Sequence, residues 1–330
     1  MTDERLAFRT CPLCEAGCGL EITVKGSTIG RIRGDMDDVF SHGFICPKGS
    51  TLKQLHEDPD RLRKPLIKRN GEHVEVEWDE AWAEIAGRLQ DVIERHGRDA
   101  VGVYLGNPGA HSLSAMLYNR TLLQGLGTHN RFSASTVDQL PKQVAAGYMF
   151  GTGVSVAVPD LDRTDYLMIL GANPYASNGS VCTAPDFPGR IEAIRARGGK
   201  VVVVDPRRTR TAEEADQWIA IRPATDALFL MAIVNVLFTE DLVKIQDHIA
   251  LLLNGLDEVR EASQEFTPER VAQATGLEPE VIRQIARELS AAKTAALYGR
   301  IGTTTTEFGT TASWLVDVVN TLTGNLDSVG

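Results

Sequence analysis

The 330-residue sequence predicts an α/β fold in which a small β-rich N-terminal region precedes a larger, doubly wound parallel sheet. Two observations predict this fold. Short alternating segments punctuated by glycine fill residues 10–60, whereas from residue 100 onward apolar strands alternate with helices, as in a parallel sheet covered on both faces. We expect the two domains to span residues 1–62 and 63–330.

In the N-terminal region, the strongest strand signal is the segment 20–24, in which apolar and polar residues alternate. Residues 61–80 are polar and contain Asn70-Gly71, a pair typical of a tight hairpin. A helix is expected at about 79–95, because apolar residues recur there every three or four positions.

The larger region is expected to contain five strands with helices between them. Each apolar run is short, ends in a polar or glycine-containing loop and precedes a helical pattern, which is typical of the units of a parallel sheet. The expected strands span residues 100–105, 166–170, 201–204, 219–221 and 294–298, with helices at about 112–125, 187–197 and after 226.

Composition and charge exclude several classes of protein. The chain is 43% hydrophobic and 24% charged, values that are typical of a globular protein and not of a disordered or collagen-like one. Its 44 acidic residues outnumber its 34 basic ones, and the resulting net charge of −10 disfavours binding to nucleic acid. No apolar run predicts a membrane span, and no signal sequence is evident, so a cytoplasmic protein is expected.

Four of the five cysteines follow the spacing of a metal site. Cys11, Cys14 and Cys18 form a C-x2-C-x3-C segment, and Cys46 lies further along, before a proline. This arrangement favours an iron–sulfur cluster. Zinc, which more often uses two separated C-x2-C pairs, and free thiols are the alternatives. Cys182 stands alone and is expected to be a small buried side chain.

Polar loops follow the predicted strands, at the sheet edge where doubly wound folds bind ligands. Arginine and threonine can hold phosphate there, and an acidic residue can hold a ribose hydroxyl or a guanine edge. Neither a G-x-G-x-x-G motif nor a P-loop is present. We therefore expect a large nucleotide-like ligand of another kind. Short polar loops are also common in their own right, and the basic run 207–210 fits a solvated patch as well as a phosphate site.

The motifs, taken in order, resemble those of the molybdopterin oxidoreductases of the dimethyl-sulfoxide-reductase superfamily, which include formate dehydrogenases and nitrate reductases. C-P-L-C-E-A-G-C and G-F-I-C-P-K-G resemble the N-terminal [4Fe-4S] domain of that family, and W-D-E-A resembles the segment that opens its next region. L-G-A-N-P, V-D-P-R-R-T and I-R-P-A-T-D resemble its nucleotide loops, and Y-G-R-I-G and T-G-N-L also fit. These eight motifs lie at residues 11–18, 43–49, 78–81, 170–174, 204–209, 221–226, 298–302 and 323–326.

This resemblance implies a redox enzyme for a small-molecule substrate. It implies a bis(molybdopterin guanine dinucleotide) cofactor carrying molybdenum or tungsten, and a [4Fe-4S] cluster on the four N-terminal cysteines that moves electrons singly. It also implies an electron-transfer partner such as a ferredoxin, a flavoprotein or an iron–sulfur subunit. Lys48 would lie between cluster and pterin. The residues implied in cofactor binding are Gly171, Asn173, Asp205, Pro206, Arg207, Arg208, Thr209, Arg222, Pro223, Thr225, Asp226 and Gly302.

The stretch that corresponds to the family's metal ligand departs from the family pattern. Family members often supply Cys, selenocysteine, Ser or Asp there, and formate dehydrogenases follow it with His. Aligning the Val-Asp pair of residues 133–144 places Val144 at the ligand position, and no cysteine lies nearby. Either Asp138 is recruited, or the metal has no protein ligand; Asp138 also fits a turn residue. Gln139, Lys142 and the loop 302–307 are the other candidates near the metal. The missing Cys-His pair weakens the case for formate as the substrate.

The length of the sequence is the second departure, since family members are usually much longer and end in a C-terminal barrel. The sequence is therefore expected to be the N-terminal portion of a longer enzyme, without that barrel. The alternatives are a non-catalytic iron–sulfur electron-transfer module, an inactive truncated fragment, and a structural domain stapled by zinc. The retained nucleotide loops at 204–209 and 221–226 argue against the electron-transfer module.

Overall fold

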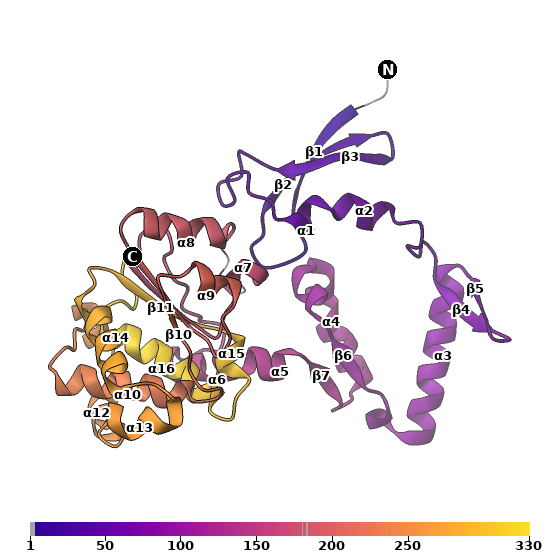
Figure 1. The fold of residues 1–330 in the computed structure, drawn as a ribbon. Coiled ribbons are helices and arrows are strands. Elements are labelled where there is room, and N and C mark those ends of the chain that lie inside the picture. Colours follow the sequence, from indigo (N-terminus) through magenta and orange to yellow (C-terminus); the bar gives the residue numbers. More distant parts are fainter. Residues whose placement is uncertain (1–3, 180, 183) are drawn as a thin grey trace. The chain divides into compact units, whose positions relative to one another are not determined.

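A computed structural model describes residues 4–179, 181–182 and 184–330. The chain forms two compact units, unit 1 at residues 1–134 and unit 2 at residues 135–330 (Figure 1). An N-terminal β-sheet region and a later parallel α/β sheet confirm the predicted fold class. The domain boundary expected at residue 62 falls inside unit 1 and stays a prediction.

The first part of unit 1 is a three-stranded antiparallel sheet in the order β1-β2-β3. The predicted strand 20–24 lies within β2, and its two neighbours were not predicted. Almost all of β1 is exposed, so it shows no alternation of buried and exposed side chains. The elements are β1 (Glu4–Thr10), β2 (Gly19–Lys25), β3 (Thr28–Gly34), α1 (Pro47–Ser50) and α2 (Leu52–Glu57).

The rest of unit 1 agrees closely with the elements predicted from the sequence. Asn70 and Gly71 join the hairpin β4-β5 with φ angles of 49° and 91°, which two-residue hairpin turns require. Both predicted helices are confirmed, and the strand expected at 100–105 shortens to three residues, paired in parallel with β7. The elements are β4 (Leu66–Arg69), β5 (Glu72–Glu75), α3 (Trp78–His96), η1 (Arg98–Ala100), β6 (Val103–Leu105), η2 (Asn107–His111), α4 (Leu113–Leu126) and β7 (Arg131–Ser133).

Unit 2 is built on a four-stranded parallel sheet in the order β10-β9-β8-β11. Its strands agree with the prediction except that β10 begins and ends two residues earlier than 219–221. The strands are β8 (Tyr166–Leu170), β9 (Lys200–Val204), β10 (Gln217–Ile219) and β11 (Ala295–Gly299). The helices are α5 (Ser135–Asp138), α6 (Leu140–Phe150), α7 (Pro174–Ser177), α8 (Phe187–Ala196), α9 (Arg210–Glu214), α10 (Asp226–Thr239), α11 (Asp247–Ala250), α12 (Leu256–Ser263), α13 (Pro268–Thr275), α14 (Pro279–Ala291), α15 (Ile301–Thr304) and α16 (Gly309–Leu322).

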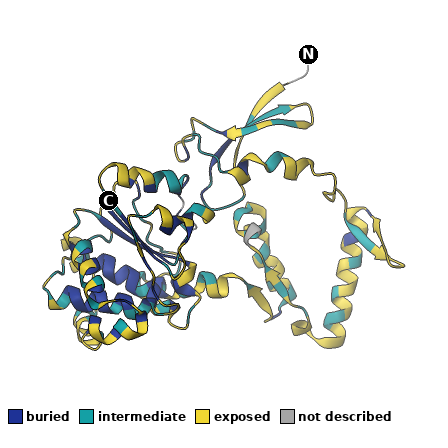
Figure 2. Cartoon of the chain, viewed as in Figure 1, coloured by how far each residue is buried: buried dark blue, intermediate teal, exposed yellow. Residues whose placement is uncertain are grey.

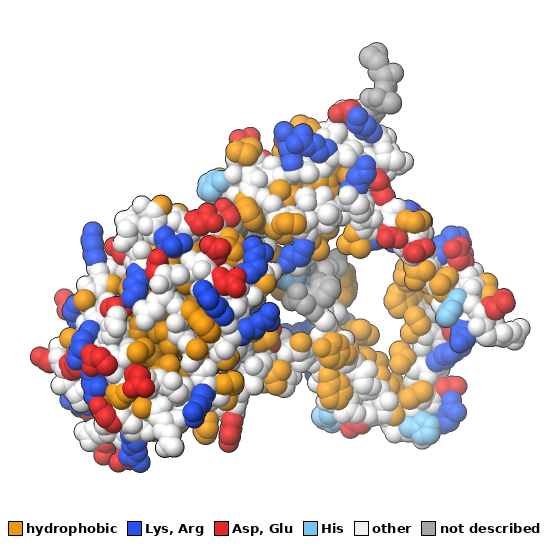
Figure 3. All heavy atoms as spheres, in the orientation of Figure 1, with side chains coloured by type: hydrophobic (Ala, Val, Ile, Leu, Met, Phe, Trp, Pro, Cys, Tyr) orange, Lys and Arg blue, Asp and Glu red, His pale blue; other side chains and the backbone are white. Residues whose placement is uncertain are grey.

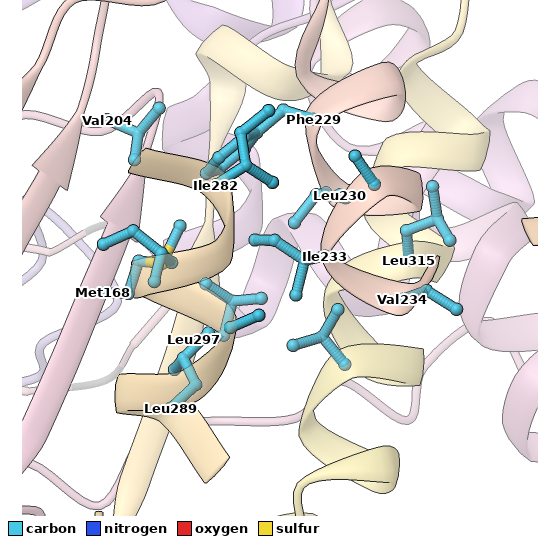
Figure 4. Close-up of a cluster of buried hydrophobic side chains, with 14 of the residues drawn as sticks. Met168, Val204, Phe229, Leu230, Ile233, Val234, Ile282, Leu289, Leu297 and Leu315 are labelled. Atoms are coloured by element: carbon cyan, nitrogen blue, oxygen red, sulfur yellow. The ribbon is translucent and has the colours of Figure 1, made fainter. Parts of the chain in front are cut away.

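Each face of this sheet packs against its own layer of helices. Alternate residues of β8 and β9 divide between two apolar clusters. Met168 and Val204 join the cluster of α10, α14 and α16 (Figure 4), whereas Ile169 and Val203 join that of α8 and α9. Strands buried on both faces are continuously apolar, which is why they were predicted well. Burying one such side chain contributes about 1.5–3 kcal/mol to the stability of the fold. Figure 2 shows the buried residues of unit 2.

Strand β11 lies at an edge of the sheet, and a side chain of α16 pairs with its backbone. Leu297 donates its N–H to Asn320 Oδ1 at 3.0 Å, and Asn320 Nδ2 donates to the Leu297 carbonyl at 3.0 Å. Asn325 Oδ1 accepts from the N–H of Ala295 at 3.0 Å. These carboxamides satisfy backbone groups that a further strand would otherwise bind.

Among the described residues, none of the helices combines the length and the apolar character needed to cross a bilayer.

Candidate functional site

The four N-terminal cysteines lie around the end of β1, the start of β2 and the start of α1. Cys11 and Cys18 are buried, and Cys14 and Cys46 are partly buried. The Cys11 N–H donates to the Cys18 carbonyl at 2.8 Å, and Gly17 turns the loop with a φ of 59°. No disulfide joins any of them in the described part of the chain.

These four thiols are close enough to influence one another's charge. Burial raises the pKa of Cys18 to about 11, and the charges of Cys11, Cys14 and Cys46 raise it further. Burial also raises the pKa of Cys11. Four thiolates gathered in this way need a cationic group among them, so the donor set fits an iron–sulfur cluster. Within the described residues, no three His, Cys, Asp or Glu side chains converge closely enough to hold a single metal ion.

Lys48 lies on α1, two residues after Cys46, and its side chain is exposed. Its charge lowers the pKa of Cys11, as the smallest of the influences on that thiol. The lysine is thus electrostatically coupled to the cysteine group. Its expected place between the cluster and a pterin stays a prediction.

In unit 2, two of the predicted cofactor residues pack directly against each other. Gly171 ends β8 with a φ of 54°, and Gly302 in α15 donates its N–H to the Gly171 carbonyl at 2.9 Å. A Cβ on Gly302 would lie 2.6 Å from the Gly171 Cα, so neither position has room for a side chain. Both glycines therefore have a packing role in bringing the loops after β8 and β11 together, whatever ligand those loops hold.

The loop after β8 also contacts the start of α9. Asn173 Oδ1 accepts from Thr211 Oγ1 at 2.7 Å. Thr209 caps α9, because its Oγ1 accepts from the N–H of Ala212 at 3.2 Å. Arg208 lies over the Trp218 ring, 5.9 Å from its centroid. Asn173 and Thr209 thus order the loops, whereas Arg208 and its exposed neighbour Arg207 keep guanidinium groups at the surface.

Two carboxyl groups from different loops influence each other at the same edge of the sheet. Asp205 follows β9, and burial raises its pKa, although it accepts the N–H of Arg207 at 2.8 Å. Asp226 begins α10 with 6% of its surface exposed. Burial raises the Asp226 pKa to about 6, and the charge of Asp205 raises it further. Paired acids of this kind can accept hydrogen bonds from the N–H groups of a base or from sugar hydroxyls.

Arg222 is oriented by backbone contacts in the loop before α10. The backbone N–H of Arg222 donates to the Thr275 carbonyl at 2.9 Å, and its side-chain Nη1 donates to the Gln273 carbonyl at 2.6 Å. Thr225 Oγ1 donates to the Arg222 carbonyl at 2.7 Å. These contacts hold the loop in place. Pro206 and Pro223, with their fixed φ angles, stiffen the two loops that carry Asp205 and Asp226.

Asp138 ends α5 and is brought to the loop after β11. Arg300 Nη2 donates to Asp138 Oδ1 at 3.2 Å, and Thr304 Oγ1 donates to the Asp138 carbonyl at 2.8 Å. Gln139 follows Asp138 in the sequence and is the N-cap residue of α6. Val144 lies on α6 and offers no donor atom for a metal. The fold places Asp138 beside a charged group, and both alternatives, Asp138 as the ligand and no protein ligand, stay predictions.

Three buried charged residues lie near Asp138: Lys142, Arg300 and Asp317. Lys142 was predicted as a candidate near the metal, whereas Arg300 and Asp317 were not predicted as site residues. Burial lowers the pKa of Lys142, the charge of Asp317 raises it, and the charge of Arg300 lowers it. Burial raises the pKa of Asp317 to about 6. The available signals were Asp317 inside the apolar run 314–319 and Arg300 directly after a predicted strand.

Two of these residues, Lys142 and Arg300, border a cavity of about 210 Å³ at the start of α6. It is lined by Gln139, Lys142, Gln143, Gly153, Val154, Val156, Val181 and Arg300. A larger groove of about 1180 Å³ runs past β11 and the C-terminal residues, and its lining is mostly apolar and backbone. The smaller cavity, with two buried cations in its wall, is the chemically distinctive one.

Comparisons with known proteins agree with this arrangement. Residues 61–330 match the family model described as molybdopterin oxidoreductase, and residues 9–57 match that of the molybdopterin oxidoreductase Fe4S4 domain. The chain is 29% identical to the F420-dependent formate dehydrogenase 2 subunit alpha of Methanococcus maripaludis, over 100% of this chain and 47% of that protein. It is 31% identical to a nitrate reductase of Symbiobacterium thermophilum, over 85% of this chain and 38% of that protein.

A solved structure, the acetylene hydratase from Pelobacter acetylenicus, superposes with a TM-score of 0.77 at 25% identity, covering 97% of this chain and 44% of that one. The chain thus spans about half the length, or less, of the relatives it matches. The two family matches indicate a molybdopterin cofactor with its metal and a [4Fe-4S] cluster.

Proposed function

The chain belongs to the molybdopterin oxidoreductase family, and from that premise we propose that it forms part of a redox enzyme acting on a small molecule. The proposed cofactor is bis(molybdopterin guanine dinucleotide) with molybdenum or tungsten. When bound, this cofactor supplies a metal centre that exchanges two electrons with the substrate. The observation that carries the proposal is the order of the parts: a four-cysteine domain followed by a parallel sheet with paired acids and arginines at its loops.

In unit 1, the chain's task is to hold the cluster and to tune it. Cys11, Cys14, Cys18 and Cys46 are the proposed ligands, and the tight turn at Gly17 allows three of them to come from one loop. Lys48 is proposed to provide a positive charge beside the cluster, on the side facing the pterin. A nearby ammonium favours the reduced, more negative state of a cluster.

In unit 2, the chain's task is to bind the nucleotide. Asp205 and Asp226 are proposed to accept hydrogen bonds from the guanine edge or the ribose hydroxyls, because burial raises the pKa of both carboxyl groups and the charge of Asp205 acts on Asp226. Arg207 and Arg208 are exposed and suited to phosphate. Arg222 is engaged with backbone carbonyls and is proposed to position its loop and present its remaining N–H groups.

Near the metal, Asp138 is the proposed protein ligand, with Gln139 beside it. The Arg300 guanidinium fixes one carboxylate oxygen of Asp138, and Thr304 fixes its backbone. These contacts would restrict the rotation of the Asp138 carboxylate and so set the direction of its second oxygen. The electron partner is proposed to be a ferredoxin, a flavoprotein or an iron–sulfur subunit, and a cytoplasmic location stays part of the proposal.

Elemental analysis of the protein purified without oxygen tests this function. We expect iron in the amount of a [4Fe-4S] cluster together with molybdenum or tungsten. Asp205→Asn combined with Asp226→Asn should remove the molybdenum or tungsten and keep the iron, whereas the exposed Asp247→Asn should change neither. Iron alone in the unaltered protein would favour the electron-transfer module, and zinc without iron would overturn the cluster and the redox function together.

A further inference from the structure

The loop between β3 and α1 carries exposed apolar side chains next to the proposed cluster ligands. It spans residues 35–46, and its last residue is Cys46 (Figure 1). Met36, Val39 and Phe40 are 73%, 86% and 42% exposed. Contact of such side chains with water is unfavourable, and exposed apolar groups that lie close together mark sites of protein interaction. The loop is therefore a candidate docking surface.

Hydrogen bonds fix this loop to the start of β2. Ser41 is 5% exposed, and its Oγ accepts the N–H of Gly19 at 3.0 Å. Asp38 Oδ2 accepts from the N–H and the Oγ of Ser41 at 2.7 and 2.6 Å. The Asp35 N–H donates to the Gly19 carbonyl at 3.0 Å. The exposed apolar side chains are thus presented by an ordered turn.

The same contacts connect the loop to the cysteine group. Gly19 directly follows Cys18. Phe44 and Ile45, near the end of the loop, pack in the apolar cluster that contains Cys11 and Cys18. Electron tunnelling slows steeply with distance, so a protein that exchanges electrons with a metal cluster has to bind close to that cluster. A redox partner that contacts this loop would meet that condition.

The charges of the loop indicate the chemistry of the partner. Asp35, Asp37 and Asp38 alternate with the apolar residues, and no lysine or arginine lies between residues 34 and 47. Hydrogen bonds from Ser41 lower the pKa of Asp38, which keeps this carboxyl group negative near neutral pH. An apolar surface with acidic groups at its rim is complementary to an apolar surface with a basic rim.

We propose that residues 35–40 form the docking surface of the electron partner, a one-electron carrier protein whose contact face is apolar and edged by lysine or arginine. The inference rests on the proposed function, because it takes the cluster as the point where electrons enter or leave the chain. In each encounter one electron passes between the cluster and the carrier, and no covalent bond forms or breaks. Apolar contact holds the carrier, and the acidic groups steer its approach.

Stopped-flow mixing of the cluster-loaded protein, reduced without oxygen, with an oxidised carrier tests the proposal. The probe is a basic cytochrome c, whose exposed haem edge is ringed by lysines. The same cytochrome with acetylated lysines serves as the probe without that charge. We expect the rate with the basic form to fall as salt is added, since salt screens the attraction. Acetylation should lower the rate at low salt by about tenfold or more.

Two substitutions separate apolar contact from charge, and the hydrogen bonds that fix the loop use neither side chain. Val39→Ser should lower the second-order rate with the basic cytochrome by about fivefold at every salt concentration, because apolar contact is lost. Asp37→Lys should lower it by about tenfold at low salt and less at high salt. The matched controls Val74→Ser in β5 and Asp60→Lys after α2 change exposed residues elsewhere in unit 1, and should leave the rate unchanged.

Equal rates for the unaltered protein and both loop variants would overturn the proposal. Equal losses in the loop variants and their controls would also overturn it. Val39→Ser should keep its iron and should pass electrons at the normal rate to ferricyanide, a small oxidant that needs no docking surface. Loss of iron in this variant would assign the loop to holding the cluster and would exclude it as a docking surface.

Metal content separates this inference from the proposed function. A protein that holds iron and shows the expected pattern of rates, but binds neither molybdenum nor tungsten, would support the docking surface and contradict the enzyme assignment. An active enzyme with its metal, whose rates with the cytochrome are the same in all four variants, would keep the proposed function and overturn the docking surface.

Discussion

In unit 2 helices cover both faces of the parallel sheet, whereas in the three-stranded sheet of unit 1 strand β1 is almost wholly exposed and most residues of β2 and β3 are only partly buried or exposed (Figure 2). Among the described residues of unit 1, the apolar side chains that are buried are Cys11, Ala16, Cys18, Leu20, Val76 and Ala81. Two of these six are proposed cluster ligands. Hydrophobic burial is thus extensive in unit 2 and sparse in unit 1, where we expect a bound cluster to contribute to the order of the chain.

The helices of unit 1 show the same contrast. On α3, Trp78, Trp82 and Ile85 are exposed, and on α4, Leu113 and Met116 are exposed. Figure 3 shows hydrophobic side chains at the surface over these helices. The helices of unit 2 that cover the sheet, by comparison, are almost continuously buried along their apolar faces. The apolar patterns predict helices equally well in both units, but the large apolar side chains of these helices are mostly exposed in unit 1 and mostly buried in unit 2.

The largest expected effect is the loss of the cluster. Cys18→Ser should remove the iron and abolish the order of residues 4–34, since a metal centre in a small domain contributes on the order of 10 kcal/mol. Amide hydrogen exchange should rise in that segment and stay low in residues 166–204. Cys182→Ala, in unit 2, is the control and should keep the iron. Equal loss of protection in both units would show that they do not differ in this way.

A matched pair of substitutions compares the hydrophobic contributions. Ile233 in α10 is 0% exposed, whereas Ile85 in α3 is 44% exposed. Ile233→Ala should lower the free energy of unfolding by about 2–5 kcal/mol, and Ile85→Ala should change it by about 0.5 kcal/mol or less. Urea unfolding followed by circular dichroism measures both. Similar losses for the two variants would mean that α3 is buried in solution.

A smaller effect on stability is expected from the buried carboxyl group of Asp226 in unit 2. The pKa of Asp226 is raised from 3.8 to about 6 in the folded state, so the folded chain holds this proton more tightly than the unfolded one. Its stabilising contribution is complete below about pH 4 and is lost as the pH rises through about 6. In the cofactor-free protein, Asp226→Asn should therefore raise stability at pH 7 by up to about 3 kcal/mol, at 1.36 kcal/mol per pKa unit.

The same substitution should have little effect near pH 4, and Asp247→Asn should have little effect at either pH. Urea unfolding at the two pH values measures the difference. A stability gain that does not depend on pH would exclude the buried carboxyl as its cause. This result would also bear on function, because a destabilising acid retained in a well-packed unit indicates selection for binding.

The sequence predicted the parts of the fold in which local pattern and burial coincide. The strands β8, β9 and β11 were located to within about one residue, because both of their faces are apolar. Strand β1 was missed because its side chains are mostly exposed, β3 because its residues are at most partly buried except at its last position, and β10 was placed two residues late. In each of these cases the strand is fixed by pairing, which a local pattern does not record.

The candidate site likewise has a part that the sequence predicts and a part that it does not. The cysteines could be predicted because their spacing alone carries the chemistry. The cavity could not, because Lys142, Arg300 and Asp317 come from three separate elements and only the fold brings them together. Lys142 was predicted as a candidate near the metal but not as a buried residue. Its burial depends on how α6 packs against α16.

The amide pair between Asn320 and Leu297 has a consequence for how far this sheet can grow. A carboxamide has the same donor and acceptor as a peptide group, so Asn320 imitates one residue of a neighbouring strand. Any fifth strand joining at β11 would first have to displace that side chain and break both bonds. A single helical residue thereby terminates the sheet, and it protects the molecule from edge-to-edge association with other chains.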